Sequence, residues 1–239
     1  MSVPGTLYLI PVALGGNDVT SVLSPALLAK LPGLRHFVAE NLKSARQFLK
    51  AAGYPHPLPS AEFQILNEHT TPAELPRLLA PLLAGRDCGL VSEAGCPAVA
   101  DPGAALVRLA HERGIRVVPL VGPSAILLAL MASGMNGQRF TFHGYLPISA
   151  EEKNIKIQEL ERITRQADAT QIFIETPYRN QALLQTLLEV CRPATLLCLA
   201  TDITLASETI RTLPVAQWKK TPPEINRRPT VFLLYRGTN

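Results

Sequence analysis

Residues 89–103 read GLVSEAGCPAVADPG, and we expect the rest of the chain to be organised around them. An apolar run typical of a buried strand, Cys88–Val91, stops at Ser92, and a helical pattern begins at Ala104. The residues between them are glycines, prolines and other small residues, which let a ligand approach the backbone and keep the loop stiff. A strand that opens into such a loop before a helix is the place where α/β sheets bind ligands. An ordinary strand–helix connection needs fewer such residues, so we expect a binding loop.

Strand-like and helix-like segments alternate on both sides of this loop. Before it, apolar runs at 7–14, 36–40 and 63–66 are separated by helical patterns, including a helix expected from Thr71 to Ala84. After it come an expected helix over 104–113 and a strand over 115–120. This rhythm predicts a mainly parallel sheet with helices on both faces.

The pattern changes beyond residue 120. Three strand-like runs near the end, at 196–200, 209–213 and 230–235, follow one another without long helices, which favours antiparallel pairing. We therefore predict an α/β fold with two domains. Residues 1–120 form an N-terminal α/β domain with a mainly parallel sheet, and residues 121–239 form a C-terminal domain with a mixed sheet.

Composition limits the partners and the compartment. With 23 basic and 19 acidic residues the net charge is +4, which permits contact with nucleic acid but falls short of a strongly basic binder. We expect a cytoplasmic protein without a membrane span, because no basic leader precedes the first apolar run and no apolar run reaches about 18 residues. The four cysteines form no CxxC pair and have no histidine at metal spacing, so we expect reduced thiols and no metal.

A second loop, Val121–Ser124, precedes an apolar helix that begins at Ala125. The free amides of a first helical turn can hold a polar ligand group. The same residues fit a capped core helix equally well, and the sequence leaves both interpretations open.

Six stretches, in order along the chain, carry a resemblance to a known family: residues 5–8 with 18–20, 39–40, 92–103, 119–125, 144–147 and 175–179. On these residues the chain resembles the tetrapyrrole methylase family of S-adenosylmethionine (SAM) methyltransferases. Within that family it is most similar to the ribosomal RNA small subunit methyltransferase I branch, which methylates a ribose 2′-hydroxyl. A Gly-x-Gly-x-x-Gly motif is absent from the sequence, so a Rossmann-type nucleotide site is not indicated.

The resemblance implies a SAM-dependent methyltransferase that binds SAM in a cleft between its two domains and releases S-adenosylhomocysteine. It also implies a homodimer, with RNA or a ribosomal subunit as the partner. The cofactor contacts that it implies come from both loops and from the start of the second domain. They are Ser92, Gly95, Cys96, Pro97, Ala98, Val99, Ser124, Ala125, Tyr145, Leu146 and Pro147.

A ribose hydroxyl must lose its proton during or after attack, and a nearby carboxylate or histidine can assist. We expect Glu40 and Glu93 to line the site, and we assign no catalytic base. Other candidates have structural explanations. Asp101 suits a helix cap, Glu175 suits an ion pair with Arg179 one helical turn later, and Glu68 with His69 suits a solvated strand end. Cys96 has no visible activating partner, so we interpret it as a packing residue.

The chain departs from the branch pattern where an acceptor would bind. An Arg-Glu-Leu-Thr-Lys run appears as Ala200–Thr204 and loses both cations, which should weaken phosphate contacts. Three functions therefore remain open. The first is methylation of RNA or of another acceptor, the second is methylation of a tetrapyrrole, and the third is SAM binding without turnover. The sequence also leaves open whether four cations form one basic patch or a scattered surface: Lys219, Lys220, Arg227 and Arg228.

Overall fold

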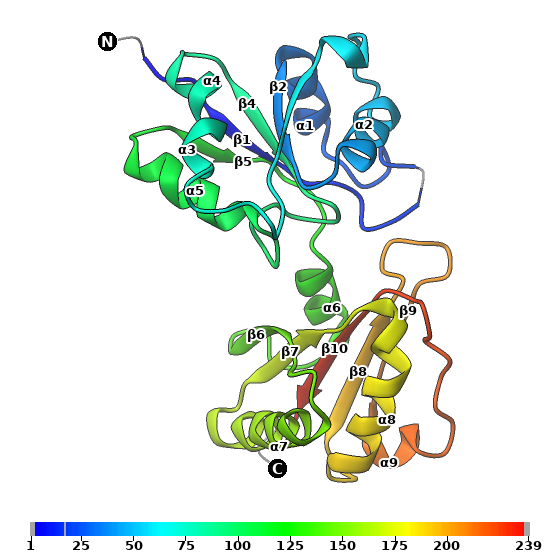
Figure 1. Cartoon of the computed structure of the whole chain (residues 1–239). Helices are drawn as coiled ribbons and strands as arrows, with labels where there is room; N and C mark the ends of the chain where they lie inside the picture. The colour runs from blue at the N-terminus through cyan, green and yellow to red at the C-terminus, as the bar shows by residue number, and fades with distance from the viewer. Residues whose placement is uncertain (1–2, 17, 237–239) are drawn as a thin grey trace. The chain divides into compact units, whose positions relative to one another are not determined.

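The computed structural model describes residues 3–16 and 18–236. The chain divides into two compact units, Met1–Ser124 and Ala125–Asn239 (Figure 1). This division falls four residues after the boundary predicted between residues 120 and 121. Residues 1–2, 17 and 237–239 of the predicted domains lie outside the described residues.

Unit 1 alternates strands and helices as its sequence pattern predicts. Its strands are β1 (Leu7–Ile10), β2 (His36–Ala39), β3 (Glu62–Ile65), β4 (Cys88–Val91) and β5 (Val117–Pro119). Its helices are α1 (Pro25–Lys30), α2 (Leu42–Ala51), α3 (Leu75–Leu78), α4 (Ala80–Leu83) and α5 (Gly103–Glu112), with 3-10 turns at Leu31–Gly33 and Leu58–Ser60. The strands pair in the order β3-β2-β4-β1-β5, and all four pairings are parallel.

Helices cover both faces of this sheet, and the two-residue period of the strands assigns side chains to each face. Phe37 and Val91 pack with α1 and α2 on one face. Val38 and Leu90 pack with α3, α4 and α5 on the other (Figure 1). Because both faces are covered, β1, β2 and β4 are mostly apolar, whereas the edge strand β3 is half polar and more exposed. The predicted parallel sheet with flanking helices is confirmed.

Two expectations for unit 1 need correction. The strand expected over 7–14 ends at Ile10, because Pro11 has no backbone N–H with which to continue the ladder. The helix expected from Thr71 to Ala84 is two short helices that begin at Leu75 and Ala80. Pro81 breaks the continuous helix, since it lacks the N–H that would reach back one turn.

Unit 2 contains β6 (Phe140–Tyr145), β7 (Thr170–Ile174), β8 (Leu196–Thr201), β9 (Thr209–Pro214) and β10 (Thr230–Tyr235). Its helices are α6 (Ala125–Ser133), α7 (Ala150–Ala167), α8 (Asn180–Val190) and α9 (Val215–Trp218), with a 3-10 turn at Pro177–Arg179. The strand order is β6-β7-β10-β8-β9. The pair β6–β7 is parallel and the other three pairs are antiparallel, so the predicted mixed sheet is confirmed.

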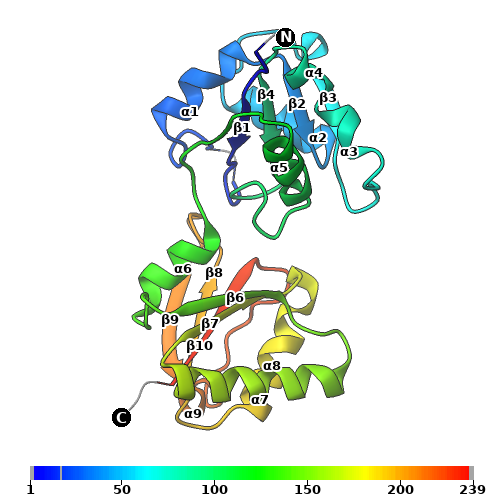
Figure 2. The same ribbon diagram turned by 90° about the vertical axis from the view of Figure 1, so that its left-hand side faces the viewer.

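The core of unit 2 lies between the sheet and α7, α8 and α9 (Figure 2). Phe173 and Phe232 stack there with parallel rings and centroids 5.8 Å apart. Trp218 closes the core, and its indole N–H donates to the carbonyl of Leu197 at 2.8 Å. Helix α6 contacts β8, β9 and β10.

Candidate functional site

The loop over residues 92–103 leaves β4 in a strained conformation. Ala98 and Ala100 have positive φ angles of 66° and 54°, and Gly95 has one of 68°. The left-handed region costs a residue with a Cβ roughly 1–2 kcal/mol, so such a conformation persists only where the surroundings hold it. Two strained alanines within three residues are therefore typical of a functional loop.

The ends of neighbouring strands hold this loop in place. Gly95 forms an isolated antiparallel bridge with Val12, with N–O distances of 2.9 and 3.2 Å. The Ser92 hydroxyl donates to the Gly95 carbonyl at 2.7 Å, and the Cys96 thiol donates to the Pro123 carbonyl at 3.4 Å. Because β4, β1 and β5 are neighbours, three strand ends meet at this loop.

Asp101 organises the second half of the loop. One carboxylate oxygen, Oδ1, accepts the Ala98 amide at 3.1 Å and the Gly103 amide at 2.7 Å. Gly103 is the first residue of α5, so the carboxylate serves an amide of the first helical turn and also faces the positive end of the helix dipole. The structural role expected for Asp101 fits this geometry.

The first-loop residues expected to hold the cofactor differ in exposure. Ser92, Gly95 and Pro97 are buried and form the frame of the loop, whereas Val99 is 47% exposed. Cys96 is half-buried, and burial raises the pKa of its thiol. A thiol that is harder to ionise is a poor nucleophile, which supports its interpretation as a packing residue.

The second loop is packed just as closely. A Cβ added to Gly122 would lie 2.3 Å from the Pro11 side chain, so only glycine fits there. The Ser24 hydroxyl donates to the Val121 carbonyl at 3.2 Å. Ser124 is the last residue of unit 1. The residues after β1 and β5 are thus fixed against each other beside the first loop.

Two carboxylates stand at the same edge of the sheet. Glu40 follows β2 and Glu93 lies two residues after β4, and these strands are neighbours. Burial is the main reason why the pKa of Glu40 is raised, and the charges of Glu93, Asp101 and Glu68 add to the effect. Glu93 accepts the hydroxyl of Ser44 at 2.5 Å, a contact that the sequence analysis missed.

The remaining polar pair in unit 1 is solvated. The side chains of Glu68 and His69 are 86% and 83% exposed, and they lie 3.6 Å apart. The interpretation of this pair as a solvated strand end therefore fits the structure better than a catalytic role.

The other expected cofactor residues belong to unit 2. Ala125 opens α6, and Tyr145, at the end of β6, is 57% exposed. Leu146 is only 4% exposed and belongs to the core of unit 2, so its side chain is not available to a ligand. Pro147 is half-buried beside it.

Glu175 stands at the carboxyl end of β7 and is almost completely buried. Its Oε1 accepts the Thr176 amide at 2.7 Å and the guanidinium of Arg179 at 2.6 and 3.0 Å, as its helical spacing predicts. Its Oε2 is buried and makes no hydrogen bond to the residues that the structure describes.

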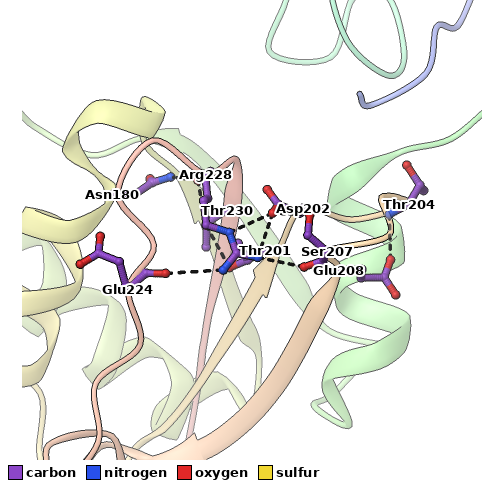
Figure 3. A network of polar contacts seen from close by, with 9 residues as sticks. All are labelled: Asn180, Thr201, Asp202, Thr204, Ser207, Glu208, Glu224, Arg228 and Thr230. Carbon is purple, nitrogen blue, oxygen red and sulfur yellow. Dashed lines mark hydrogen bonds and ion pairs between the residues drawn. The ribbon is translucent and has the colours of Figure 1, made fainter. Parts of the chain in front are cut away.

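A network of polar contacts joins the ends of β8 and β10 (Figure 3). Arg228 donates through Nε to Asp202 at 2.8 Å, and Ser207 donates to the same carboxylate oxygen at 2.8 Å. The side-chain amide of Asn180 donates to the Arg228 carbonyl at 2.6 Å. Arg228 is therefore neutralised by a buried partner and does not act as a free surface cation.

The antiparallel pairing of β8 with β9 and β10 shows that the four cations Lys219, Lys220, Arg227 and Arg228 do not form one basic patch. Arg227 and Arg228 precede β10, at the end of the sheet where Thr230 pairs with Thr201. Lys219 and Lys220 come shortly after β9, whose last residue pairs with the first residue of β8. The two pairs of cations lie at opposite ends of the sheet, so they form a scattered surface.

No helix in the described part of the chain is long and apolar enough to span a membrane. Over the same residues, no group of three or more histidine, cysteine, aspartate or glutamate side chains has an arrangement that could hold a metal ion.

Comparison with known proteins gives several curated relatives that share one name. A ribosomal RNA small subunit methyltransferase I from Pseudomonas aeruginosa is 33% identical over 213 residues, which cover 89% of this chain and 71% of the relative. The protein of the same name from Xylella fastidiosa (strain Temecula1) is 32% identical over 239 residues, covering 99% of this chain and 83% of the relative.

The chain belongs to the ribosomal RNA small subunit methyltransferase I family. The sequence-based resemblance is confirmed, and so is the prediction of a methyltransferase enzyme. No protein-family model matches the chain.

Solved structures of other methyltransferases share the fold of this chain. A crystal structure of the methyltransferase CobJ has a TM-score of 0.65 and 20% identity, covering 98% of this chain and 97% of that one. A uroporphyrin-III C-methyltransferase from Thermus thermophilus has a TM-score of 0.53 and 19% identity, covering 97% and 92%. The fold is therefore that of the tetrapyrrole methylases.

Proposed function

We propose that this methyltransferase takes its methyl group from SAM and holds SAM on the loop over residues 92–103. The observation that carries the proposal is the combination of a fixed backbone with exposed residues. The contacts of Gly95 and Asp101 fix the loop, while the strained Ala98 is half-buried and Val99 is about half exposed. A loop that is already ordered loses little entropy when a ligand binds.

The charge at this edge of the sheet suits a cationic cofactor. SAM supplies a methyl group on a positively charged sulfonium, and Glu40 and Glu93 place negative charge on two adjacent strand ends. Methyl transfer is an in-line displacement: the acceptor oxygen bonds to the methyl carbon while the carbon–sulfur bond breaks and its electron pair stays on sulfur. Alignment of the reacting atoms supplies much of the rate, and a fixed loop provides it.

We propose that Glu40 takes up the proton of the acceptor hydroxyl. A raised pKa makes this carboxylate a stronger base than an ordinary exposed glutamate. Glu93 then acts as a positioning residue, held by its bond to Ser44, and its charge contributes to the raised pKa of Glu40.

We propose an RNA ribose hydroxyl as the acceptor, because the relatives that match most of this chain are named as ribosomal RNA methyltransferases. A tetrapyrrole acceptor has weaker support, since the uroporphyrin-III methyltransferase is only 19% identical. SAM binding without turnover is the third outcome to test. By the same resemblance we propose that the protein is cytoplasmic and forms a homodimer. Sedimentation velocity would detect the dimer.

Calorimetric titration with SAM and with S-adenosylhomocysteine tests the cofactor. We expect micromolar binding of both. If neither binds, the proposed cofactor site is wrong.

Transfer of a labelled methyl group tests the acceptor. Small ribosomal subunits and uroporphyrinogen would be offered separately, and mass spectrometry would locate the methyl group. We expect a labelled ribose, and we expect Glu40→Gln to lower the rate by about a hundredfold or more while SAM still binds. Label on the tetrapyrrole alone would assign the second function, and SAM binding without label on either would assign the third.

A further inference from the structure

Unit 2 contains a cavity of about 580 Å³ at the end of its sheet that lies opposite to Glu175 and Asp202. It is lined by residues of the C-terminal half of α7, the end of α8 with the segment that follows, and the residue after β10. Four of the lining residues are arginines: Arg162, Arg165, Arg192 and Arg236.

The charge around this cavity is strongly unbalanced. The lining contains one acidic residue, Glu161, against the four arginines, which leaves a net charge of +3 where the whole chain has +4. Such a concentration in a hollow attracts anions more strongly than the same charges scattered over a surface.

Glu161 offsets the charge of one arginine, Arg192, and leaves the other three without a carboxylate partner in the lining. It is 8% exposed, and its Oε1 accepts the Arg192 amide at 2.7 Å and the hydroxyl of Thr195. Its Oε2 lies 3.9 Å from Nε of Arg192. The buried carboxylate thus joins α7 to the segment after α8 and fixes Arg192 at the rim.

The other three guanidinium groups are available for a ligand. Arg162 donates to the amide oxygen of Gln166 at 2.5 Å and forms no ion pair with the residues that the structure describes. The guanidinium groups of Arg165 and Arg236 make no hydrogen bond or ion pair with residues that the structure describes. The negative end of the α7 dipole accounts for arginines in its last turns, but it does not account for Arg236 on another element.

We propose that this cavity is a binding site for phosphate groups, which the planar forks of several arginines match in charge and geometry. The phosphates come either from the backbone of an RNA or from a small phosphorylated molecule. The site lies wholly in unit 2, whereas the loop over residues 92–103 belongs to unit 1, so phosphate binding here is separate from SAM binding there.

The test compares two double variants of the full chain. Arg165→Gln with Arg236→Gln removes two of the four arginines from the lining. Arg108→Gln with Arg113→Gln removes the same charge from exposed positions on and next to α5 in unit 1. Fluorescence anisotropy would measure the binding of a labelled single-stranded RNA at several salt concentrations, and calorimetry would measure inorganic pyrophosphate. SAM affinity and thermal melting serve as checks on folding.

We expect the cavity variant to bind RNA about tenfold less tightly. The slope of log K against log salt concentration should become smaller in magnitude by about 1.4, because two phosphate contacts are lost. SAM affinity and the melting temperature stay unchanged. Loss of both RNA and pyrophosphate binding assigns RNA as the source, and loss of pyrophosphate alone assigns a small ligand. Unchanged affinity for both probes, or an equal loss in the control variant, would overturn the proposal.

Discussion

Gly95 offers the sharpest test of the proposed cofactor loop, through the substitution Gly95→Ala. Its φ angle is +68°, which costs a residue with a Cβ roughly 1–2 kcal/mol. Alanine also lowers the conformational entropy of the unfolded chain, which stabilises the folded state by about 0.4–1 kcal/mol. The added Cβ would lie 3.1 Å from the end of the Leu14 side chain and 3.4 Å from the Pro123 carbonyl oxygen. These contacts push the loop away from the neighbouring strand ends, so we expect a loss of stability of about 1 kcal/mol together with a displaced loop.

Gly114→Ala is the matched control. Gly114 has nearly the same φ angle, +66°, but its added Cβ would meet nothing within 4 Å. It follows α5, outside the loop over residues 92–103. Urea unfolding should therefore show a similar loss of about 1 kcal/mol in both variants.

Calorimetry with SAM separates the two variants. We expect Gly95→Ala to bind SAM about tenfold less tightly, equivalent to about 1.4 kcal/mol, and Gly114→Ala to bind it as the unchanged protein does. Wild-type affinity in Gly95→Ala would refute the argument that the loop's position determines SAM binding. An equal loss of affinity in both variants would show that general destabilisation is responsible.

Three further predictions concern individual contacts. Asp101→Ala should lower the free energy of unfolding by about 2 kcal/mol, because two amides lose their shared acceptor. Asp101→Asn keeps an oxygen at that place and should lose only about half as much. Equal losses for the two variants in urea unfolding would contradict this. Glu93→Gln removes a negative charge that raises the pKa of Glu40, so carboxyl NMR should show Glu40 titrating at lower pH. An unchanged titration midpoint would rule out an electrostatic interaction between the two carboxylates. Trp218→Phe should cost about 2 kcal/mol in thermal unfolding, because the bond to the Leu197 carbonyl and part of the core packing are lost; a neutral result would mean that this bond adds little.

Local sequence signals predicted the elements that depend on neighbouring residues. The side chain of Asn41 accepts two amides at the start of α2, the usual contact of an asparagine at that position. Glu175 and Arg179 meet at their helical spacing. Such contacts need only a few residues to order together, so the chain specifies them over short distances.

Some residues that commonly start a helix form a turn in the structure instead. The expected helix start at Thr71 is a turn in which the Thr71 amide and hydroxyl donate to Glu74 at 2.9 and 3.0 Å. Asp18 makes a similar turn with Thr20 and Ser21, while Ser24 caps α1. Both turns use residues that stabilise a turn and a helix start equally well, so their sequence alone does not distinguish the two.

The amino-acid sequence is enough to predict the alternation of strands and helices, the loop at residues 92–103 and the methyltransferase family. Which residues meet around that loop depends on how the chain folds in three dimensions. The strand order β3-β2-β4-β1-β5 places β4 between β2 and β1, which brings Glu93 beside Ser44 and Gly95 beside Val12. The fold of unit 2 likewise brings four arginines from three separate segments around one cavity. Strand order and cavities arise from contacts between residues far apart in the chain, and local propensities and short motifs contain no information about which distant segments will pair.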